Sequence, residues 1–217
     1  MSDIIFIRHG QASFGADDYD KLSPLGHQQA AWLAEHLKAV DHHVDQIVCG
    51  DLRRHRETAA PIEEMFGQEA RIDPRLNEFD YDALAERYHI HAPHHGPAAS
   101  RDEFLHLMPE IFHAWENDAL SGATEDYPEF QMRIDDAVDD ALCHGQRVVI
   151  VASGGPIAVT LRRVLGLTTR ATADMLLNIR NSSYHLFQYE AGRLRLSQYN
   201  ASPHLERPER RHALTYI

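Results

Sequence analysis

The chain has 217 residues, 43% of them hydrophobic and 25% charged, an ordinary globular mixture that suits one α/β domain or a core domain with an inserted cap. Lys and Arg number 21 against 33 Asp and Glu, which gives a formal net charge of −12. This balance argues against a broad surface for nucleic acid or anionic membrane, although a few local arginines can still make a positive cleft for a small anionic substrate.

Two further features bear on where the protein works. Cys49 and Cys143 are the two cysteines, too few for a disulfide framework, and this favours a reducing cytoplasm. The N-terminal run lacks the basic region and apolar length of a signal peptide, and no stretch approaches the ~20 apolar residues of a membrane span. We therefore expect a cytoplasmic protein with no nucleic-acid or membrane partner, and no sequence signal indicates an oligomeric state.

Histidine is frequent, with 16 residues, but no His-Glu-x-x-His or Cys-x-x-Cys pattern marks a metal site. His91, His94 and His95 lie close together beside Pro93 and Gly96, a setting that favours an exposed polar loop over a metal site. We expect no metal and no cofactor.

The first half of the chain predicts strands that alternate with helices. A nearly continuous apolar run at residues 4–7 suits a strand buried on both faces, and this strand ends at Arg8. After a loop, Ser23 before Pro24 predicts the N-cap and first residue of a helix that ends near residue 40. The next predicted elements are a strand at 45–50, a helix at 52–66 and a short strand at 71–73.

In the second half, residues 82–143 are mostly helical in pattern but repeatedly broken by proline and glycine. We interpret them as an inserted helical cap at 82–126 and a return helix at 127–143. The clearest central strand is 147–152, which runs into Ser153-Gly154-Gly155-Pro156. The remaining predicted elements are a helix at 156–165, two strands at 183–190 and 193–200, and a tail over the surface at 201–217.

This order of elements predicts an α/β fold, a three-layer α/β/α sandwich with a mainly parallel sheet and an inserted helical cap, in a single domain of residues 1–217. Ligands of such folds bind beyond the carboxyl ends of the strands. Two predicted strand ends carry unusual chemistry: the run Arg8-His9-Gly10 and the run that begins at Ser153.

An Arg-His pair just past a buried strand suits a nucleophilic imidazole. The ring must be neutral to attack, and a neighbouring arginine both disfavours its protonation and binds the incoming phosphate. Gly10 would let the backbone approach a ligand closely. Taken alone, this three-residue string is weak evidence, and an ordinary loop histidine is the simpler interpretation.

The start of the helix after the second strand adds a second set of arginines. Helix N-termini bind anions, and guanidinium groups bind phosphate through two parallel hydrogen bonds. For Arg53 and Arg56 a solvated basic patch is the simpler interpretation, whereas Arg54 belongs to the pattern described next.

Four segments together resemble the signatures of the histidine phosphatase superfamily, also called the phosphoglycerate mutase-like family. The order and spacing agree from residue 3 to about residue 200, which makes the set specific. The matches are Arg-His-Gly after a strand (Arg8, His9, Gly10), Leu-Thr/Ser-x-x-Gly-x-x-Gln-Ala (Leu22, Ser23, Gly26, Gln29, Ala30), an arginine four residues before Thr-Ala (Arg54, Thr58, Ala59), and Leu-x-Glu (Leu76, Asn77, Glu78).

The resemblance implies a role for each catalytic residue. His9 attacks phosphorus and carries the phosphoryl group, while Arg8 and Arg54 bind the phosphoryl oxygens and stabilise the charge of the transfer. Glu78 protonates the leaving oxygen and then deprotonates the water that hydrolyses phosphohistidine, with Asp80 as its nearest substitute. The arginines supply the positive charge, so the reaction needs no metal.

The residues after the nucleophile bear on substrate and reaction type. Gln11 and Ser13 are candidates for contact with the substrate. The familiar mutases of the family follow Arg-His-Gly with Glu-Ser and, shortly after, Trp-Asn. The run Gln-Ala-Ser-Phe-Gly at 11–15 lacks that asparagine, which favours hydrolysis over mutase transfer.

One departure from the family pattern puts catalytic competence in question. The family places a second histidine in Ser-His-Gly-Gly at the end of the late central strand, and Ser153 stands at that position here. Loss of one preorganised donor typically costs ~10²–10³ in rate. Three outcomes are open: Ser153 and the N–H groups of Gly154 and Gly155 hold the phosphate, another histidine fills the gap, or the protein binds phosphate esters without turnover.

Ser153 is not predicted to be a hydrolase nucleophile itself. The nucleophile elbow needs the pattern Gly-x-Ser-x-Gly, and Val151 stands where its first glycine is required.

The sequence therefore predicts a metal-independent phosphatase that hydrolyses a small phosphate monoester through a phosphohistidine on His9. Mutase-type phosphoryl transfer and a catalytically weak or inactive phospho-ligand-binding protein are the alternatives. The predicted catalytic residues are His9, Arg8, Arg54 and Glu78, and the predicted substrate-binding residues are Gln11, Ser13, Ser153 and Gly154.

Overall fold

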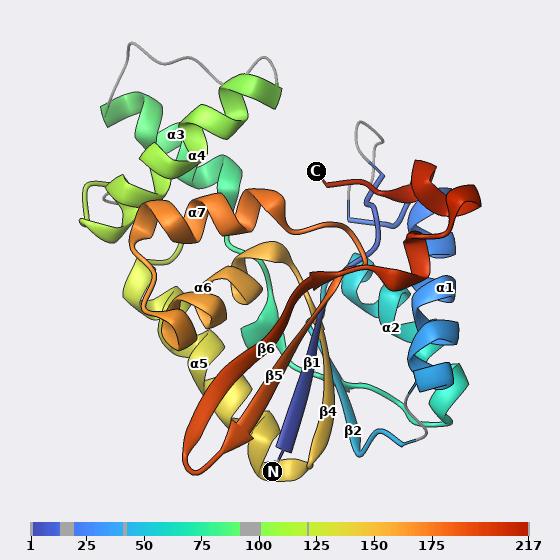
Figure 1. The fold of residues 1–217 in the computed structure, drawn as a ribbon. Helices are drawn as coiled ribbons and strands as arrows, with labels where there is room; N and C mark the ends of the chain where they lie inside the picture. Colours follow the sequence, from blue (N-terminus) through green and yellow to red (C-terminus); the bar gives the residue numbers. More distant parts are fainter. Residues whose placement is uncertain (1, 14–19, 41–42, 92–100, 121, 217) are drawn as a thin grey trace.

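A computed structural model describes residues 2–13, 20–40, 43–91, 101–120 and 122–216. Within them, six strands form one sheet in the order β3-β2-β4-β1-β5-β6 (Figure 1). Strands β3, β2, β4 and β1 pair in parallel, whereas β5 and β6 are joined antiparallel at one side. The strands are β1 (Ser2–Arg8), β2 (Gln46–Cys49), β3 (Arg71–Ile72), β4 (Arg147–Ala152), β5 (Tyr184–Glu190) and β6 (Arg193–Ala201).

Helices cover both faces of this sheet, which confirms the predicted α/β/α sandwich (Figure 1). The α-helices are α1 (Pro24–Val40), α2 (Arg53–Phe66), α3 (Tyr81–His91), α4 (Arg101–Glu116), α5 (Tyr127–His144), α6 (Gly154–Leu165) and α7 (Thr169–Asn178). Three short 3₁₀ helices are η1 (Pro74–Leu76), η2 (Pro203–Leu205) and η3 (Pro208–Ala213).

The central strand β1 divides two hydrophobic cores, because successive strand residues point to opposite faces. Ile5 and Ile7 belong to the core beneath α1 and α2. Ile4 and Phe6 belong to the core beneath α5, α6 and α7. A strand buried on both faces must be apolar at every position, and this explains the continuous run that the sequence shows.

The first predicted helix begins as expected. The Ser23 hydroxyl accepts a hydrogen bond from the Gly26 N–H at 3.0 Å, which is the N-cap arrangement, and Pro24 is the first helical residue. The next helix, α2, ends at Gly67 with a left-handed φ of 68°.

Helices α3 and α4 stand beyond the carboxyl ends of the parallel strands, next to α7 (Figure 1). An aromatic cluster joins this helical region to the sheet domain: the Phe79 ring lies 5.3–5.6 Å, centroid to centroid, from the rings of Phe112, Trp115 and Phe130. The predicted His91, His94 and His95 loop lies largely outside the described residues. The assignment of 82–126 as a substrate cap stays a prediction.

The predicted surface tail is only partly exposed: residues 206–209, 211 and 212 are exposed, whereas Ser202, His204, Leu205 and Ala213 are buried. Leu205 and Ala213 are completely buried. The Gln29 amide of α1 donates to the Ala213 carbonyl at 2.7 Å and to the Thr215 hydroxyl at 2.9 Å. The segment therefore packs into the molecule and holds α1 by buried hydrogen bonds.

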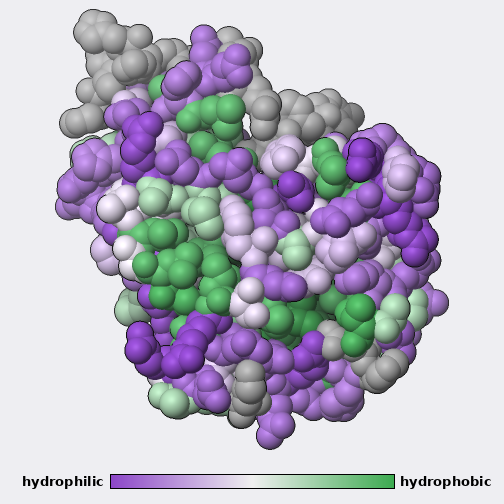
Figure 2. Space-filling view, viewed as in Figure 1, coloured by the Kyte–Doolittle hydropathy of each residue, from purple (hydrophilic) through white to green (hydrophobic). Residues whose placement is uncertain are grey.

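The surface in the view of Figure 1 is largely hydrophilic, with a hydrophobic patch over α6 and β6 (Figure 2). Among the described residues, no helix combines the length and the apolar character needed to cross a membrane.

Candidate active site

The two unusual strand ends lie side by side because β1 and β4 are parallel neighbours. Arg8 pairs with Ala152 in register, and the next N–H, that of His9, donates to the Ala152 carbonyl at 2.9 Å. His9 and Ser153 therefore leave the sheet together at its carboxyl edge. This is the edge at which α/β proteins bind ligands.

His9 is held with one ring nitrogen engaged. Its Nδ1 lies 2.7 Å from the Gly10 carbonyl oxygen, which can only accept, so Nδ1 carries the proton and Nε2 carries the lone pair. Burial lowers the pKa of His9 well below its usual range, and the charges of Arg54 and Arg8 lower it further. The ring is therefore neutral at physiological pH, as nucleophilic attack requires.

The two predicted phosphate-binding arginines both belong to this site. Arg8 is buried, and its Nη1 donates a hydrogen bond to the Ile179 carbonyl. The Arg54 side chain is 11% exposed, pairs with Asp20 at 2.7 Å and reaches Ser153 Oγ with its Nη2 at 3.5 Å. An incoming phosphate would share or displace the Asp20 carboxylate on Arg54.

Thr58 explains why the arginine of α2 stands four residues before a Thr-Ala pair. Its hydroxyl donates to the Arg54 carbonyl one turn earlier at 2.7 Å and accepts from the Gly10 N–H at 3.0 Å. One side chain thus fixes the loop after His9 relative to the start of α2.

Close backbone contact explains the glycines of the first two signatures. A Cβ on Gly10 would lie 2.5 Å from the Gly26 carbonyl oxygen, and one on Gly26 would lie 2.1 Å from the Gln11 carbonyl oxygen. Both distances are far shorter than a real carbon–oxygen contact. Gln29 adds a hydrogen bond from the Gln11 N–H to its Oε1 at 2.7 Å. The loop after His9 is thereby fixed against the first turn of α1.

Glu78 faces the start of α6. Its Oε2 accepts from the Gly155 N–H at 3.0 Å, and a Cβ on Gly155 would lie 2.0 Å from Oε1. Burial raises the pKa of Glu78 above its usual range, although the Gly155 N–H and the charges of Arg54 and Arg8 oppose the shift. A carboxyl with a raised pKa suits a general acid.

Sequence reasoning assigned no role to His55, and the structure places it inside the site. Its Nε2 lies 2.7 Å from Ser153 Oγ, and its ring centroid lies 5.7 Å from that of His9. The sequence did leave open a substitute histidine, but His55 and Ser153 are 98 positions apart, and no local pattern indicates their contact. Its place directly after Arg54 was the available signal.

Gln11 and Ser13 make contacts within the loop itself. Gln11 Oε1 accepts from the Ser23 hydroxyl at 2.8 Å, and the Ser13 hydroxyl donates to the Leu22 carbonyl at 3.1 Å. Their contact with substrate stays a prediction. Gly154 lies at the site, since a Cβ there would lie 4.0 Å from both Arg8 Nε and Glu78 Oε2.

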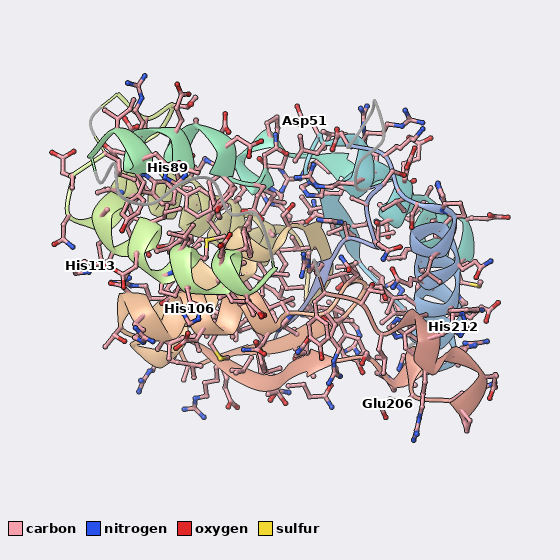
Figure 3. The ribbon with its side chains drawn as sticks, turned by 90° about the horizontal axis from the view of Figure 1, so that it is seen from above. Asp51, His89, His106, His113, Glu206 and His212 are labelled. Atoms are coloured by element: carbon pink, nitrogen blue, oxygen red, sulfur yellow. The ribbon has the colours of Figure 1, made fainter. Side chains whose placement is uncertain are left out.

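Among the described residues, no group of three or more His, Cys, Asp or Glu is arranged to hold a metal ion. The labelled histidines of the helical region, His89 on α3 and His106 and His113 on α4, lie apart from one another (Figure 3). The predicted machinery consists of one imidazole, two guanidinium groups and one carboxyl, which is a set for phosphoryl transfer.

Comparison with known proteins identifies the family of the chain. The profile of the histidine phosphatase superfamily (branch 1) matches residues 4–202. The chain belongs to the histidine phosphatase superfamily.

Two curated relatives carry different activities in their names. "Probable phosphoglycerate mutase GpmB" of an Enterobacter species is 25% identical over 205 residues, which cover 88% of this chain and 86% of that protein. "Putative phosphoserine phosphatase 2" of Hydrogenobacter thermophilus is 29% identical over 191 residues, 82% of this chain and 84% of that protein.

Two solved structures share the fold. A mycobacterial glucosyl-3-phosphoglycerate phosphatase, solved with inorganic phosphate, has a TM-score of 0.67 and 25% identity, and covers 95% of this chain and 100% of that one. Phosphoserine phosphatase of Entamoeba histolytica has a TM-score of 0.69 and 20% identity, and the match covers 94% of this chain and 100% of that one. The named relatives are phosphatases or mutases, both of which transfer phosphoryl groups.

Proposed function

We propose that the protein is a phosphatase that hydrolyses a small phosphate monoester through a phosphohistidine on His9. The observation that carries the proposal is the state of this ring. It is neutral, its Nε2 carries the lone pair, and it stands with two arginines and a carboxyl of raised pKa.

In the first step, the Nε2 lone pair of His9 attacks phosphorus and a P–N bond forms as the ester P–O bond breaks. The Glu78 carboxyl gives its proton to the departing oxygen, so the leaving group departs as a neutral alcohol. Arg8 and Arg54 donate hydrogen bonds to the phosphoryl oxygens, where negative charge is concentrated in the transition state.

In the second step, the Glu78 carboxylate takes a proton from a water molecule, whose oxygen attacks phosphorus. The P–N bond breaks, and the electron pair returns to His9 Nε2. Inorganic phosphate leaves, and both residues regain their starting protonation. The hydrogen bond from Nδ1 to the Gly10 carbonyl holds the ring in one orientation through both steps.

The experiment measures phosphate release from a panel of esters by the wild type and by His9→Ala. Phosphoserine and phosphoglycerates come first in the panel, because relatives are named for them. p-Nitrophenyl phosphate is included as a general ester. We expect activity on at least one ester and loss of about 10⁴-fold or more in His9→Ala, the scale for removal of a nucleophile. Wild-type activity no higher than that of His9→Ala would exclude the phosphatase.

Mutase-type transfer is a second candidate, supported by the relatives named as phosphoglycerate mutases. It predicts a phosphohistidine that survives in water and passes its phosphoryl group to a second sugar or acid phosphate. A third candidate, phosphate-ester binding without turnover, is supported by Ser153 and predicts tight phosphate binding with no release of product.

A further inference from the structure

His55 lies inside the site without a role in the steps above. It is completely buried at the start of α2, and its Nε2 lies 2.7 Å from Ser153 Oγ. A Cβ on Gly50 would lie 2.2 Å from its Nδ1, so the ring occupies space that glycine alone leaves open. The imidazole is therefore fixed between the end of β2, the nucleophile loop and the end of β4.

The Ser153 hydroxyl does not cap the helix that follows it. Ser153 is the N-cap residue of α6, the position where a serine side chain ordinarily accepts from the first turn, but it makes no such hydrogen bond. Its oxygen instead faces His55 Nε2 and Arg54 Nη2. Both groups can donate to it, and the guanidinium can only donate.

The direction of the His55–Ser153 hydrogen bond decides what the serine can do. If the hydroxyl donated to Nε2, Ser153 would turn lone pairs toward the unprotonated phosphoryl oxygens, which can only accept. If Nε2–H donates, the hydroxyl proton is free to point at phosphate. A bound phosphate therefore selects the second direction, which needs a neutral imidazole with its proton on Nε2.

We propose that His55 is a positioning residue that, through Ser153, supplies the phosphate-binding donor that the family takes from a histidine at position 153. The His55 N–H donates to Ser153 Oγ, and the Ser153 O–H donates to a phosphoryl oxygen beside Arg54. The hydroxyl so polarised is a stronger donor than an isolated serine, because hydrogen bonds in series strengthen one another. The inference rests on the proposed phosphoryl-transfer function of the site.

The neutral state of both histidines fits this arrangement. Burial and the Arg54 charge lower the pKa of His55 well below its usual range, as they do for His9. A charged His55 beside His9 would oppose formation of the cationic phosphohistidine, whereas a neutral ring does not.

The test measures the affinity for inorganic phosphate by calorimetry, together with kcat, in His55→Met, His55→Gln, Ser153→Ala and the double variant His55→Met/Ser153→Ala. Methionine matches the ring in size but has no N–H, whereas glutamine keeps a donor near the Nε2 position. We expect His55→Met and Ser153→Ala each to lose about 10²- to 10³-fold in kcat, the scale of one transition-state donor, and to bind phosphate more weakly than the wild type.

Because the two residues act in series, we expect the double variant to match Ser153→Ala within about twofold. We expect His55→Gln to keep more activity than His55→Met. Additive losses in the double variant, or a His55→Met variant that binds phosphate as the wild type does, would overturn the inference. A purely structural role predicts equal losses for Gln and Met.

A measurement on the wild type covers the case in which a variant fails to fold. The ¹⁵N spectrum of histidine-labelled protein saturated with phosphate should show His55 neutral and protonated on Nε2. Protonation on Nδ1 would overturn the inference. Phosphate affinity can be measured even if the wild type has no activity. If the wild type is inactive but the affinity losses of the two single variants are not additive, the proposed phosphatase is refuted and the role of His55 stands. Additive losses in an active wild type refute the role of His55 alone.

Discussion

At the scale of single residues, the site depends on which groups hold protons. His9 must be unprotonated and Glu78 protonated when the ester is attacked, and burial shifts each pKa toward that state. The rate of the proposed reaction should therefore depend on pH, on the leaving group and on substitutions that remove one of these protons.

The first prediction concerns Glu78→Gln, which removes the proton that the leaving alkoxide needs. Because Glu78 also activates the water of the second step, the test compares kcat/KM, which reports the first phosphoryl transfer alone. We expect kcat/KM for an alkyl phosphate to fall by about 10²–10⁴, the usual range for general acid catalysis. The loss with p-nitrophenyl phosphate should be much smaller, because its leaving group is stable as an anion. Equal losses for both esters would assign the acid role to another group, and Asp80→Asn is the matched control.

The second prediction is the pH profile of kcat/KM. The lowered pKa of His9 lets the nucleophile stay neutral well below pH 6.5, so the acid side of the profile is displaced downward. Because its pKa is raised, Glu78 stays protonated to a higher pH than an ordinary glutamate. Activity falls as the pH rises through that pKa. The kcat/KM of the alkyl phosphatase activity should thus be highest between the pKa values of His9 and Glu78, and its decline toward higher pH should vanish in Glu78→Gln.

The third prediction concerns Ser153→His, which introduces the family residue. With Ser153 Oγ only 2.7 Å from His55 Nε2, a second imidazole has no room, and overpacking typically costs about 1–3 kcal/mol. We expect lower activity for Ser153→His alone and recovery when it is combined with His55→Ala. A gain of activity in the single variant would show that the pocket does have space. The comparison is made on kcat/KM.

At the scale of elements, the start of α2 organises the site. Arg54, His55 and Thr58 lie within its first turns: Arg54 and His55 both contact Ser153 after β4, and Thr58 contacts Gly10 in the loop after His9. The helix therefore brings together segments that are far apart in the sequence.

The fourth prediction follows from Thr58, which links the Gly10 N–H to the Arg54 carbonyl. Thr58→Val keeps the shape but leaves the buried Gly10 N–H without an acceptor, which costs about 1–3 kcal/mol. We expect a corresponding drop in the urea midpoint and a reduced kcat, because the loop after His9 loses an anchor. Thr58→Ser keeps the hydroxyl and should stay close to wild type in both measurements.

Most elements could be predicted from the sequence because each has a local signal. The apolar run of β1, the Ser23-Pro24 start of α1 and the glycine that ends α2 are such signals. Helix α7 was not predicted, since threonines at 168, 169 and 172 are weak helix formers. It is stabilised instead by packing against α4 and α6.

The residues of the candidate site also fall into those with a local sequence signal and those without one. His9, Arg54 and Glu78 were recognisable because each lies within a fixed local pattern, and Ser153 because it departs from one. The His55–Ser153 contact and the buried part of the tail depend on tertiary packing between distant segments, and no local pattern records such a contact.

At the scale of the whole molecule, buried histidines make stability depend on pH. The pKa values of His185 and His204 are both about 3 in the folded chain, chiefly because of burial. An unfolded histidine titrates near pH 6.5, so the unfolded state binds more protons below that pH and stability is lost as pH falls.

The fifth prediction tests this linkage with His204→Gln, which cannot be protonated and can still pair with the Ser182 hydroxyl. Between pH 7 and pH 5, each such histidine should cost the wild type about 2 kcal/mol of unfolding free energy. In urea titrations, the unfolding free energy of His204→Gln should fall between pH 7 and pH 5 by about 2 kcal/mol less than that of the wild type. A drop in His204→Gln as large as that of the wild type would contradict the linkage.

The sheet order also constrains how the chain can acquire its structure during synthesis. Strand β1 is translated before either of its neighbours, β4 and β5, which come from the last third of the chain. Until β4 leaves the ribosome, the apolar β1 has no native partner and the loop of His9 has no Ala152 carbonyl to bind. Such non-local pairing slows folding and leaves hydrophobic surface exposed meanwhile. His9 is thus made well before the strand that positions it.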